Sequence, residues 1–524
     1  MPKSVMTNRF NEVPVASIPR SSFDRTHGYK TTFNAGYLVP FYLDEALPGD
    51  TFNLRMTGFA RLATPIKPIM DNMFMDTHFF AVPKRLVWDN WEKFNGQQDN
   101  PGDSVDYVIP TQTAPSGTGF PENTTADYLG LPIGVEGITV NTLPFRCYNL
   151  IYNEWFRDQN IQNSVTVPKD DATDSTLILR RRGKRHDYFT SCLPWPQKPG
   201  LGQVVLPLGS TAPVAADTGI GAADTPDVII GSVDPVGGRF LTGNLPNVQM
   251  NVANNQRSPN LVADLSNATA ATINELRQAF QVQKMQERDA RGGTRYTEII
   301  RSHFGVVSPD ARLQRPEFLG GGSTYVNINP VEQKAPPQGT DPTATTPQGN
   351  LAATGTASMS GHGFTKSFTE HCYILGFVSV RADLTYQDGI DRLWNRRTRN
   401  DFYWPALSHI GEQAVLNKEI YAQGTSVDDQ VFGYQERYAE YRYKPSKITG
   451  KFRSKAENKL DYWHLGQDFS SLPVLQSTFI QENPPVDRVI AVQDEPHFLF
   501  DAYVQLRCAR PMPVYGVPGL IDHF

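Results

Sequence analysis

NMFMDTHFFAVPKRLVWDNWEKFNG, residues 72–96, is the segment around which the rest of the chain is organised. Its first half is rich in aromatic and other apolar residues and contains neither Gly nor Pro before Pro83, which has no N–H to donate to a sheet. Residues 73–82 are therefore predicted to form a β-strand. The second half places Leu86 and Val87, then Trp91 and Phe94, on one side at three- and four-residue spacing before Gly96. This spacing predicts a short helix that ends at the glycine.

Two polar residues interrupt the predicted strand. Asp76 and His78 fall on the same strand face as Phe74 and Phe80. A catalytic pair would need a third member, and nothing nearby in the sequence supplies one. We interpret Asp76 and His78 as a hydrogen-bonded pair on a crowded sheet face.

Further strands are predicted on both sides of this segment. Residues 51–56 alternate cleanly, with Phe52, Leu54 and Met56 on one face and Asn53 and Arg55 on the other, until Gly58 suggests a bulge. The same two-residue period in 374–386 and 498–508 predicts half-buried strands late in the chain. Helical spacing appears in 143–160 and 272–289. Strands near both ends, with long excursions between them, predict one β-sandwich or jelly roll with enlarged loops.

The composition supports a loop-rich protein with a substantial core. The 524 residues include 41 Gly and 40 Pro, which favours many turns, and 39% of the residues are hydrophobic. No apolar run approaches 18 residues, and the mean hydropathy is −0.41, so we expect no membrane insertion. The N-terminal residues contain no secretion signal, which predicts a cytoplasmic chain. Four widely spaced cysteines are expected to be reduced and buried.

The sequence divides into four predicted parts. Residues 1–35 are read as an N-terminal arm, and residues 36–200 as the first part of the β-fold with loop helices. Residues 201–267 contain no Lys and only one aromatic residue, Phe240, which predicts an ordered surface insertion. Residues 268–524 are expected to complete the fold. Within them, 335–360 is predicted to be a mobile low-complexity loop.

No set of residues converges on a catalytic or metal site. Residues 320–323, GGGS, lack the lysine of a phosphate-binding loop and are predicted to be a flexible turn. His409 and Glu412 are the nearest approach to a metal-ligand pair, but no further ligand accompanies them. The prediction is therefore a protein without catalytic residues, metal or cofactor.

Two basic clusters are candidates for intermolecular contacts. The run LILRRRGKRHDY, residues 177–188, is either a solvated loop or a site that contacts DNA phosphates, and its candidate residues are Arg180, Arg181, Arg182, Lys184 and Arg185. The run DRLWNRRTRNDFYWP, residues 391–405, mixes arginines with aromatic residues, as both interface hot spots and sites for single-stranded nucleic acid do, and we favour subunit contact. Its candidates for subunit contact are Arg392, Trp394, Arg396, Arg397, Arg399 and Trp404.

Several long motifs, in one order, carry a family resemblance. They include 18–54 (IPRSSFDRTHGYKTTFNAGYLVPFYLDEALPGDTFNL), 182–200 (RGKRHDYFTSCLPWPQKPG), 382–405 (ADLTYQDGIDRLWNRRTRNDFYWP) and 509–524 (ARPMPVYGVPGLIDHF), besides the opening segment. The chain resembles the major capsid proteins of gokushoviruses, which are single-stranded DNA phages of the microvirus family. The resemblance runs from about residue 8 to the C-terminus. It fails mainly at 201–267 and 335–360.

The resemblance implies a mainly β protein, an eight-stranded antiparallel jelly roll of the viral capsid type with long inserted loops and a few helices. About sixty copies, grouped as pentamers, would close a T=1 shell around circular single-stranded DNA. It further implies a small basic DNA-binding partner, a host receptor contacted through 201–267, and assembly in the bacterial cytoplasm into a virion. Trp88 and Trp91 then become candidates for packing beneath the long loops or for contact with a neighbouring subunit. The alternative is a secreted β-sandwich enzyme or lectin.

Overall fold

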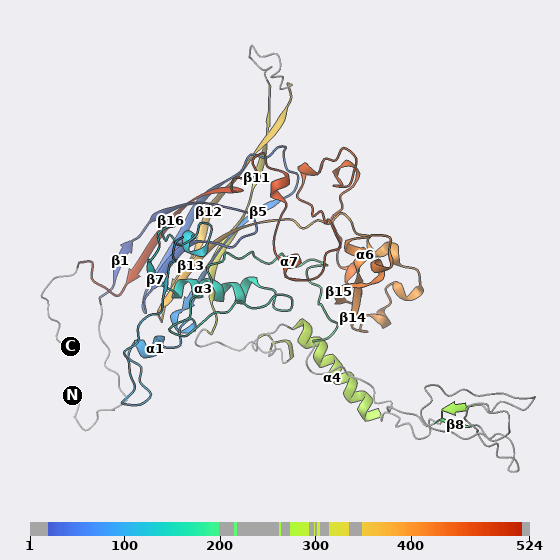
Figure 1. Ribbon diagram of the computed structural model, residues 1–524, viewed down its shortest axis with the longest axis horizontal. Helices are drawn as coiled ribbons and strands as arrows, with labels where there is room; N and C mark the ends of the chain where they lie inside the picture. The colour runs from blue at the N-terminus through green and yellow to red at the C-terminus, as the bar shows by residue number, and fades with distance from the viewer. Residues whose placement is uncertain are drawn as a thin grey trace, which may run out of the picture. The chain divides into compact units, whose positions relative to one another are not determined.

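The computed structural model describes residues 19–198, 273–292, 314–334 and 348–515, and the short segments 214–216, 261–263, 298 and 301–303. The chain divides into two compact units. The first contains residues 1–196 and 305–524, and the second contains residues 197–304. The β-structure of the first unit consists mainly of two antiparallel sheets (Figure 1).

The first sheet has six strands in the described part of the chain, paired in the order β1-β16-β4-β12-β11, with β2 beside β1 on the same edge of β16. Their bounds are β1 (Ser21–Asp24), β2 (His27–Phe33), β4 (Thr51–Leu62), β11 (Asn327–Glu332), β12 (Leu351–Ser367) and β16 (Phe498–Arg510). The alternation predicted for 51–56 and 498–508 is confirmed, because every second residue of β4 and β16 is buried.

The second sheet has the order β10-β5-β13-β3. Its strands are β3 (Val39–Ala46), β5 (Met73–Pro83), β10 (Glu317–Tyr325) and β13 (Cys372–Ala382). The opening segment forms β5, which confirms the predicted strand, while the single helix predicted after Pro83 is divided into a 3-10 turn at Lys84–Leu86 and the one-turn helix α1 (Trp91–Phe94). Gly96 follows the helix with a φ of 94°, the left-handed conformation that suits a glycine after a helix.

The strand order shows how the chain winds. Strands β2, β3, β4 and β5 alternate between the two sheets, β10 stays beside β5, and β12, β13 and β16 alternate again. The first sheet thus contains the row β2-β16-β4-β12, and the second contains β3-β13-β5-β10. This is jelly-roll winding, with β1 and β11 as additional edge strands. The sheets therefore exceed the predicted eight strands.

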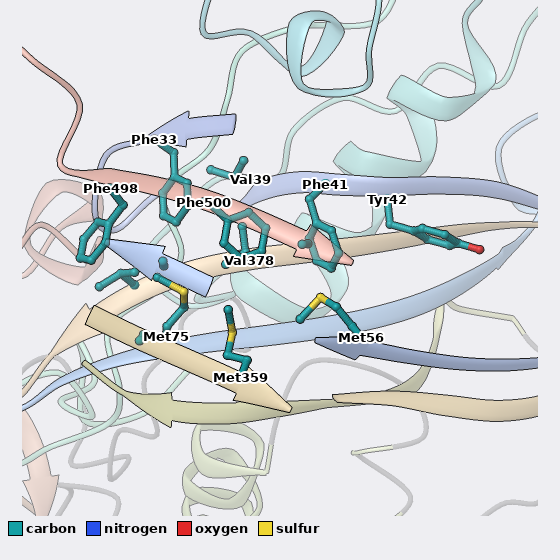
Figure 2. Packing of buried hydrophobic residues seen from close by; sticks show 14 of the residues in the cluster. Phe33, Val39, Phe41, Tyr42, Met56, Met75, Met359, Val378, Phe498 and Phe500 are labelled. Atoms are coloured by element: carbon teal, nitrogen blue, oxygen red, sulfur yellow. The ribbon is translucent and has the colours of Figure 1, made fainter. Parts of the chain in front are cut away.

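The main core fills the space between the sheets. Figure 2 shows aromatic side chains from β2, β3 and β16 opposite methionines from β4, β5 and β12. The Phe33 and Phe498 rings stack with centroids 5.7 Å apart, and Phe41 meets Phe500 edge-on at 5.8 Å. Such ring pairs add to the stabilisation from burial alone.

The outer face of the second sheet is covered as well. Helix α3 (Leu143–Ile151), continued by a π-helical turn at Tyr152–Phe156, packs its Tyr148 against Phe377 of β13. Every residue of β13 is buried as a result, so the prediction that this strand is half-buried is wrong. Its polar residues Ser379 and Arg381 lie under the covering layer.

The glycine run at 320–322 is part of β10, so the prediction of a flexible turn there is wrong. A Cβ on Gly321 would overlap the backbone oxygen of Thr77, and a Cβ on Gly322 would meet the His362 ring. These glycines permit close packing. The bulge expected at Gly58 occurs instead on the facing strand β12, where Gly361 adopts a φ of 75° between Ser360 and His362.

Two predicted boundaries shift. Residues 21–33 of the predicted arm form β1 and β2, and residues 351–360 of the predicted loop belong to β12. Residues 1–18 and 335–347 lie outside the described residues, and so does most of the predicted insertion at 201–267. The second unit contains the strand pair β8 (Val214–Ala216) and β9 (Leu261–Ala263), and helix α4 (Ile273–Arg291), which matches the helix predicted at 272–289.

The remaining elements of the first unit are short. The loop before α3 contains β6 (Thr111–Thr113), α2 (Thr125–Tyr128) and β7 (Thr139–Asn141). After β13 the chain forms the strand pair β14 (Glu412–Leu416) and β15 (Val431–Glu436) with α6 (Asn417–Ile420) and α7 (Ser477–Ile480). This region has its own small core, which includes Tyr188, Phe189, Phe432 and Phe479.

Candidate functional site

Asp76 lies at the centre of a buried ion cluster on β5. Its Oδ2 accepts hydrogen bonds from Arg182 Nη1 at 2.7 Å and from Arg381 Nε at 2.9 Å, and its Oδ1 accepts one from Ser323 Oγ at 2.6 Å. Burial alone would raise the pKa of Asp76, but the Ser323 hydrogen bond and the two guanidinium groups hold that pKa below its ordinary value. The cluster joins β5, β10 and β13 to the basic run at 177–188.

His78 takes no part in this cluster, so the predicted Asp76–His78 hydrogen bond is wrong. The His78 Nδ1 is buried without a hydrogen-bond partner, and the ring lies among Phe80, Phe156 and Phe318. Burial and the positive charge of Arg182 lower the pKa of His78 to about 4. The ring is therefore neutral near pH 7 and packs as an aromatic side chain.

The basic run is held against the start of β3. The Arg180 carbonyl accepts from the Leu38 N–H, the Arg182 N–H donates to the Gly36 carbonyl, and the Arg180 N–H donates to Tyr148 Oη. The Arg181 guanidinium lies 4.2 Å above the Tyr37 ring. Arg180, Arg181 and Arg182 thus hold the fold together through contacts within the chain.

Lys184 is also directed inward. Its Nζ lies 4.6 Å from the centre of the Phe479 ring, and burial lowers its pKa although Glu482 opposes that shift. Arg185 is exposed. Of the five residues predicted to contact DNA, Arg185 is the one whose side chain faces solvent.

Two arginines of the second cluster also serve the fold. Arg392 Nη1 lies 2.9 Å from Glu419 Oε1, and Arg396 Nη2 lies 3.3 Å from Glu440 Oε1. Glu419 is buried, and burial raises its pKa in spite of the nearby Arg392. These pairs fix the segment 391–405 against α6 and the residues that follow β15.

The rest of that segment is exposed. Trp394 keeps 72% of its surface in this chain, and Arg397 is exposed beside it in the sequence. We call the following neighbouring side chains the aromatic patch: Phe402, Tyr403, Trp404 and Tyr441, each 40–50% exposed. Arg399 stacks 4.5 Å from the Trp404 ring, and the Tyr403 N–H donates to Tyr441 Oη. Ordered aromatic and arginine side chains at a surface are typical of interface hot spots.

Trp88 and Trp91 are not at the surface. Trp88 is fully buried, Trp91 is 9% exposed, and both belong to the core that covers β5 and β13. Trp88 donates its indole N–H to Asp171, and Lys84 Nζ lies 4.9 Å from the Trp91 ring. Of the two alternatives for these tryptophans, packing beneath the loops and contact with a neighbouring subunit, the contacts within the chain favour the first.

Within the described ranges, no group of three or more His, Cys, Asp or Glu side chains is placed to hold a metal ion. Among the described helices, none is long and apolar enough to cross a membrane. A cavity of about 250 Å³ beside Trp394 is lined partly by Arg392, Glu419 and Glu440, which already pair with one another.

Comparison with known proteins agrees with the architecture. The sequence profile of the family described as capsid protein (F protein) matches residues 11–520. The chain is 49% identical to capsid protein VP1 of Bdellovibrio phage phiMH2K, over 98% of both chains. It is 46% identical to capsid protein VP1 of Chlamydia phage 1, over 99% of this chain and 98% of that protein. Capsid protein VP1 of Spiroplasma virus 4 is 38% identical over 96% of both chains.

Proposed function

Because this chain belongs to the capsid protein (F protein) family of phages and is a major capsid protein of the virion, we propose that it assembles into a T=1 icosahedral shell around circular single-stranded DNA. About sixty copies would close such a shell, grouped as pentamers. The observation that supports the structural role is similarity over nearly the whole length to proteins named as capsid proteins. Its function is structural, and the alternative of a secreted enzyme or lectin is set aside.

Contacts between subunits would involve the aromatic patch and the neighbouring Trp394. The patch is rigid before assembly, since Arg399 stacks on Trp404 and Arg396 lies 4.1 Å from the Tyr441 ring. Side chains that are already ordered lose little conformational entropy when a neighbour covers them. Of the remaining candidates, Arg397 and Arg399 are exposed beside the patch, whereas Arg392 and Arg396 would act by holding it in place.

The enclosed DNA would be neutralised by more than this chain. The net charge of the chain is −5, so local basic groups and a small basic DNA-binding protein would supply the counter-charge. Arg185 is the residue of the basic run that can reach a phosphate without breaking the fold. Residues 201–267 would form the element that contacts a host cell-surface receptor, because their Lys-free and aromatic-poor composition suits a solvated surface insertion. Assembly would take place in the bacterial cytoplasm.

Electron microscopy of the purified chain tests this proposal. We expect pentamers or closed shells of uniform size. A species that stays strictly monomeric at every concentration would contradict the proposal. Shells of clearly larger diameter would contradict the T=1 geometry while leaving the capsid role intact.

A further inference from the structure

The two sheets of the sandwich differ in what covers their outer faces. The second sheet is covered by the core of α3 and its neighbours. The first sheet carries no such layer among the described residues, and the outward-facing residues of β4 and β16 are exposed. We call this surface the open sheet face. It contains Asn53, Arg55, Thr57, Phe59 and Arg61 of β4, Leu499, Asp501, Tyr503, Gln505 and Arg507 of β16, with Lys30 of β2 and Ser358 and Ser360 of β12 at its sides.

Two of its arginines are unpaired. No hydrogen bond or ion pair engages the side chain of Arg55 or Arg61 among the residues that the structure describes. They are six residues apart on β4, so their Cα atoms are about 20 Å apart. Each could therefore hold a different phosphate of one extended strand. Arg507 adds a third exposed guanidinium near Asp24.

Aromatic rings lie between these charges. Phe59 and Tyr503 are each 51% exposed. Both side chains point outward from the sheet, where polar residues usually lie. Phe59 pairs across the strands with Asp501, and Tyr503 pairs with Thr57. Exposed rings among arginines allow bases to stack while the phosphates are neutralised, which is the usual arrangement for binding a single strand without sequence preference.

A groove continues from this surface. It has a volume of about 620 Å³ and is lined by Phe59, Arg61, Leu499 and Ile133, together with the carboxylates of Glu122, Asp127 and Asp501. The groove is large enough for a nucleobase on the Phe59 ring. The carboxylates of the groove would repel phosphate, so the DNA backbone would lie closer to Arg61 than to them.

The remaining outward residues favour a polar ligand over a protein partner. They are mainly hydroxyl and amide groups, namely Asn53, Thr57, Ser358, Ser360 and Gln505. Lys30 lies 3.4 Å from Asp501, so the charge left for a ligand is that of the arginines. Arginine and aromatic side chains also occur in protein–protein interfaces, but the buried centre of such an interface is more apolar than this face, whose other outward residues are mostly polar.

We propose that the open sheet face is the inner surface of the shell and binds the single-stranded DNA directly, through Arg55, Arg61 and Arg507 on phosphates and through Phe59 and Tyr503 on bases. This inference rests on the proposed capsid function and extends it by assigning the DNA-facing residues. It places most direct DNA contact on the sheet, because four of the five basic residues of the 177–188 run are used within the fold.

The test uses the full-length chain and a fluorescein-labelled oligo(dT) of roughly 20 nucleotides. The variant R55Q/R61Q is compared with K169Q/K451Q, which removes the same charge from two other exposed positions. We expect R55Q/R61Q to bind about tenfold more weakly at moderate salt, and to lower the slope of log K against log salt by about 1.4, since each phosphate contact on a single strand contributes about 0.7. The control variant should bind as the unmodified chain does.

Particle formation is measured in parallel. R55Q/R61Q should still form shells, with reduced DNA content. Unchanged oligonucleotide affinity and DNA content in R55Q/R61Q would overturn the DNA-binding assignment, and so would loss of shells with unchanged affinity, which would make the face a subunit contact. Failure of the unmodified chain to form any shell would instead contradict the capsid geometry, so the two failures are distinguishable.

Discussion

Arg182 Nη1 lies 2.7 Å from Asp76 Oδ2, although 106 residues separate the two in the chain. Arg381 approaches the same carboxylate oxygen from β13, and both arginine side chains are largely buried. A basic run that looks like a nucleic-acid contact in sequence thus supplies the counter-charge for a buried acid. The contact also determines which substitutions in that run test DNA binding and which test folding.

The ion cluster predicts an unequal effect of removing its members. Asp76→Ala leaves two buried guanidinium groups without their acceptor, so the free energy of unfolding should fall by about 3–5 kcal/mol. Arg182→Met should cost less, about 1–3 kcal/mol, because Arg381 still neutralises Asp76. Urea denaturation of unassembled chains measures both, with the exposed Lys451→Met as control. If neither change lowered the free energy of unfolding measurably, the cluster would not stabilise the fold.

The contacts of Arg180, Arg181 and Arg182 within the chain affect how DNA packaging experiments are designed. If Arg180, Arg181 and Arg182 contacted DNA, replacing all three by Ala would reduce packaged DNA in shells that still form. The structure indicates that such a variant would lose stability as well, so its DNA content would be ambiguous. Arg185→Gln tests the exposed residue of the run alone.

His78 predicts a pH dependence of stability. The folded-state pKa of about 4 lies below the ordinary value of 6.5, because the buried ring resists protonation. The stability that depends on the neutral ring is complete above pH 6.5 and is lost as the pH falls toward 4, by up to about 3 kcal/mol. In His78→Phe, the aromatic contacts remain and this loss should disappear. Unfolding free energies measured from pH 7 to pH 4 compare the two chains, and identical slopes would exclude His78 as the cause.

Trp394 predicts an effect on assembly without an effect on folding. Its side chain is 72% exposed, so Trp394→Ser should leave the melting temperature of the unassembled chain unchanged. If a neighbouring subunit covers this tryptophan, the concentration needed for assembly should rise about tenfold or more. Val108→Ser removes another hydrophobic side chain, 80% exposed, and is the control. Light scattering and electron microscopy give the yield of shells, and a normal yield from Trp394→Ser would remove it from the interface.

Deleting residues 205–262 tests the proposed insertion. The deletion lies inside the second unit, whereas the two sheets that form the main core belong to the first unit. Shells should therefore still form, whereas attachment to host cells should be lost. Particle counts and adsorption assays measure the two properties separately. Lost assembly together with preserved attachment would assign these residues the opposite role.

Regular alternation made part of the fold predictable. In β4 and β16 one face is buried and the other is solvated, so Phe52 and Leu54 could be separated from Asn53 and Arg55 by sequence period alone. β13 was correctly predicted as a strand, but one of its faces was wrongly predicted to be exposed. The two-residue period of a sequence does not show whether a second layer covers the polar face of the strand. β10 and the first half of β12 were missed. Their Gly, Ser, Thr and Ala residues resemble a loop in composition, and close packing between strands explains why small residues are needed there.

The functional surfaces were predicted less well, for a related reason. Arg182 and Arg399 occur in equally basic runs, but Arg182 is buried against Asp76 whereas Arg399 stacks on Trp404 at the surface. The difference depends on residues distant in the sequence. For Trp88 the sequence left packing beneath the loops and contact with a neighbouring subunit both open, and the position of α3 shows that it is covered from within the chain.

Strand β16 comes last in the sequence of strands, yet it lies between β4 and the edge formed by β1 and β2. While the chain is being synthesised, the first sheet has a gap that its earlier strands cannot close, because their partner has not yet left the ribosome. The N-terminal strands have nothing to pair with until residues 498–510 emerge. The first sheet is thus completed only after residues 498–510 have been synthesised, so chains truncated before them would lack a finished sheet and would be poor candidates for incorporation into a particle.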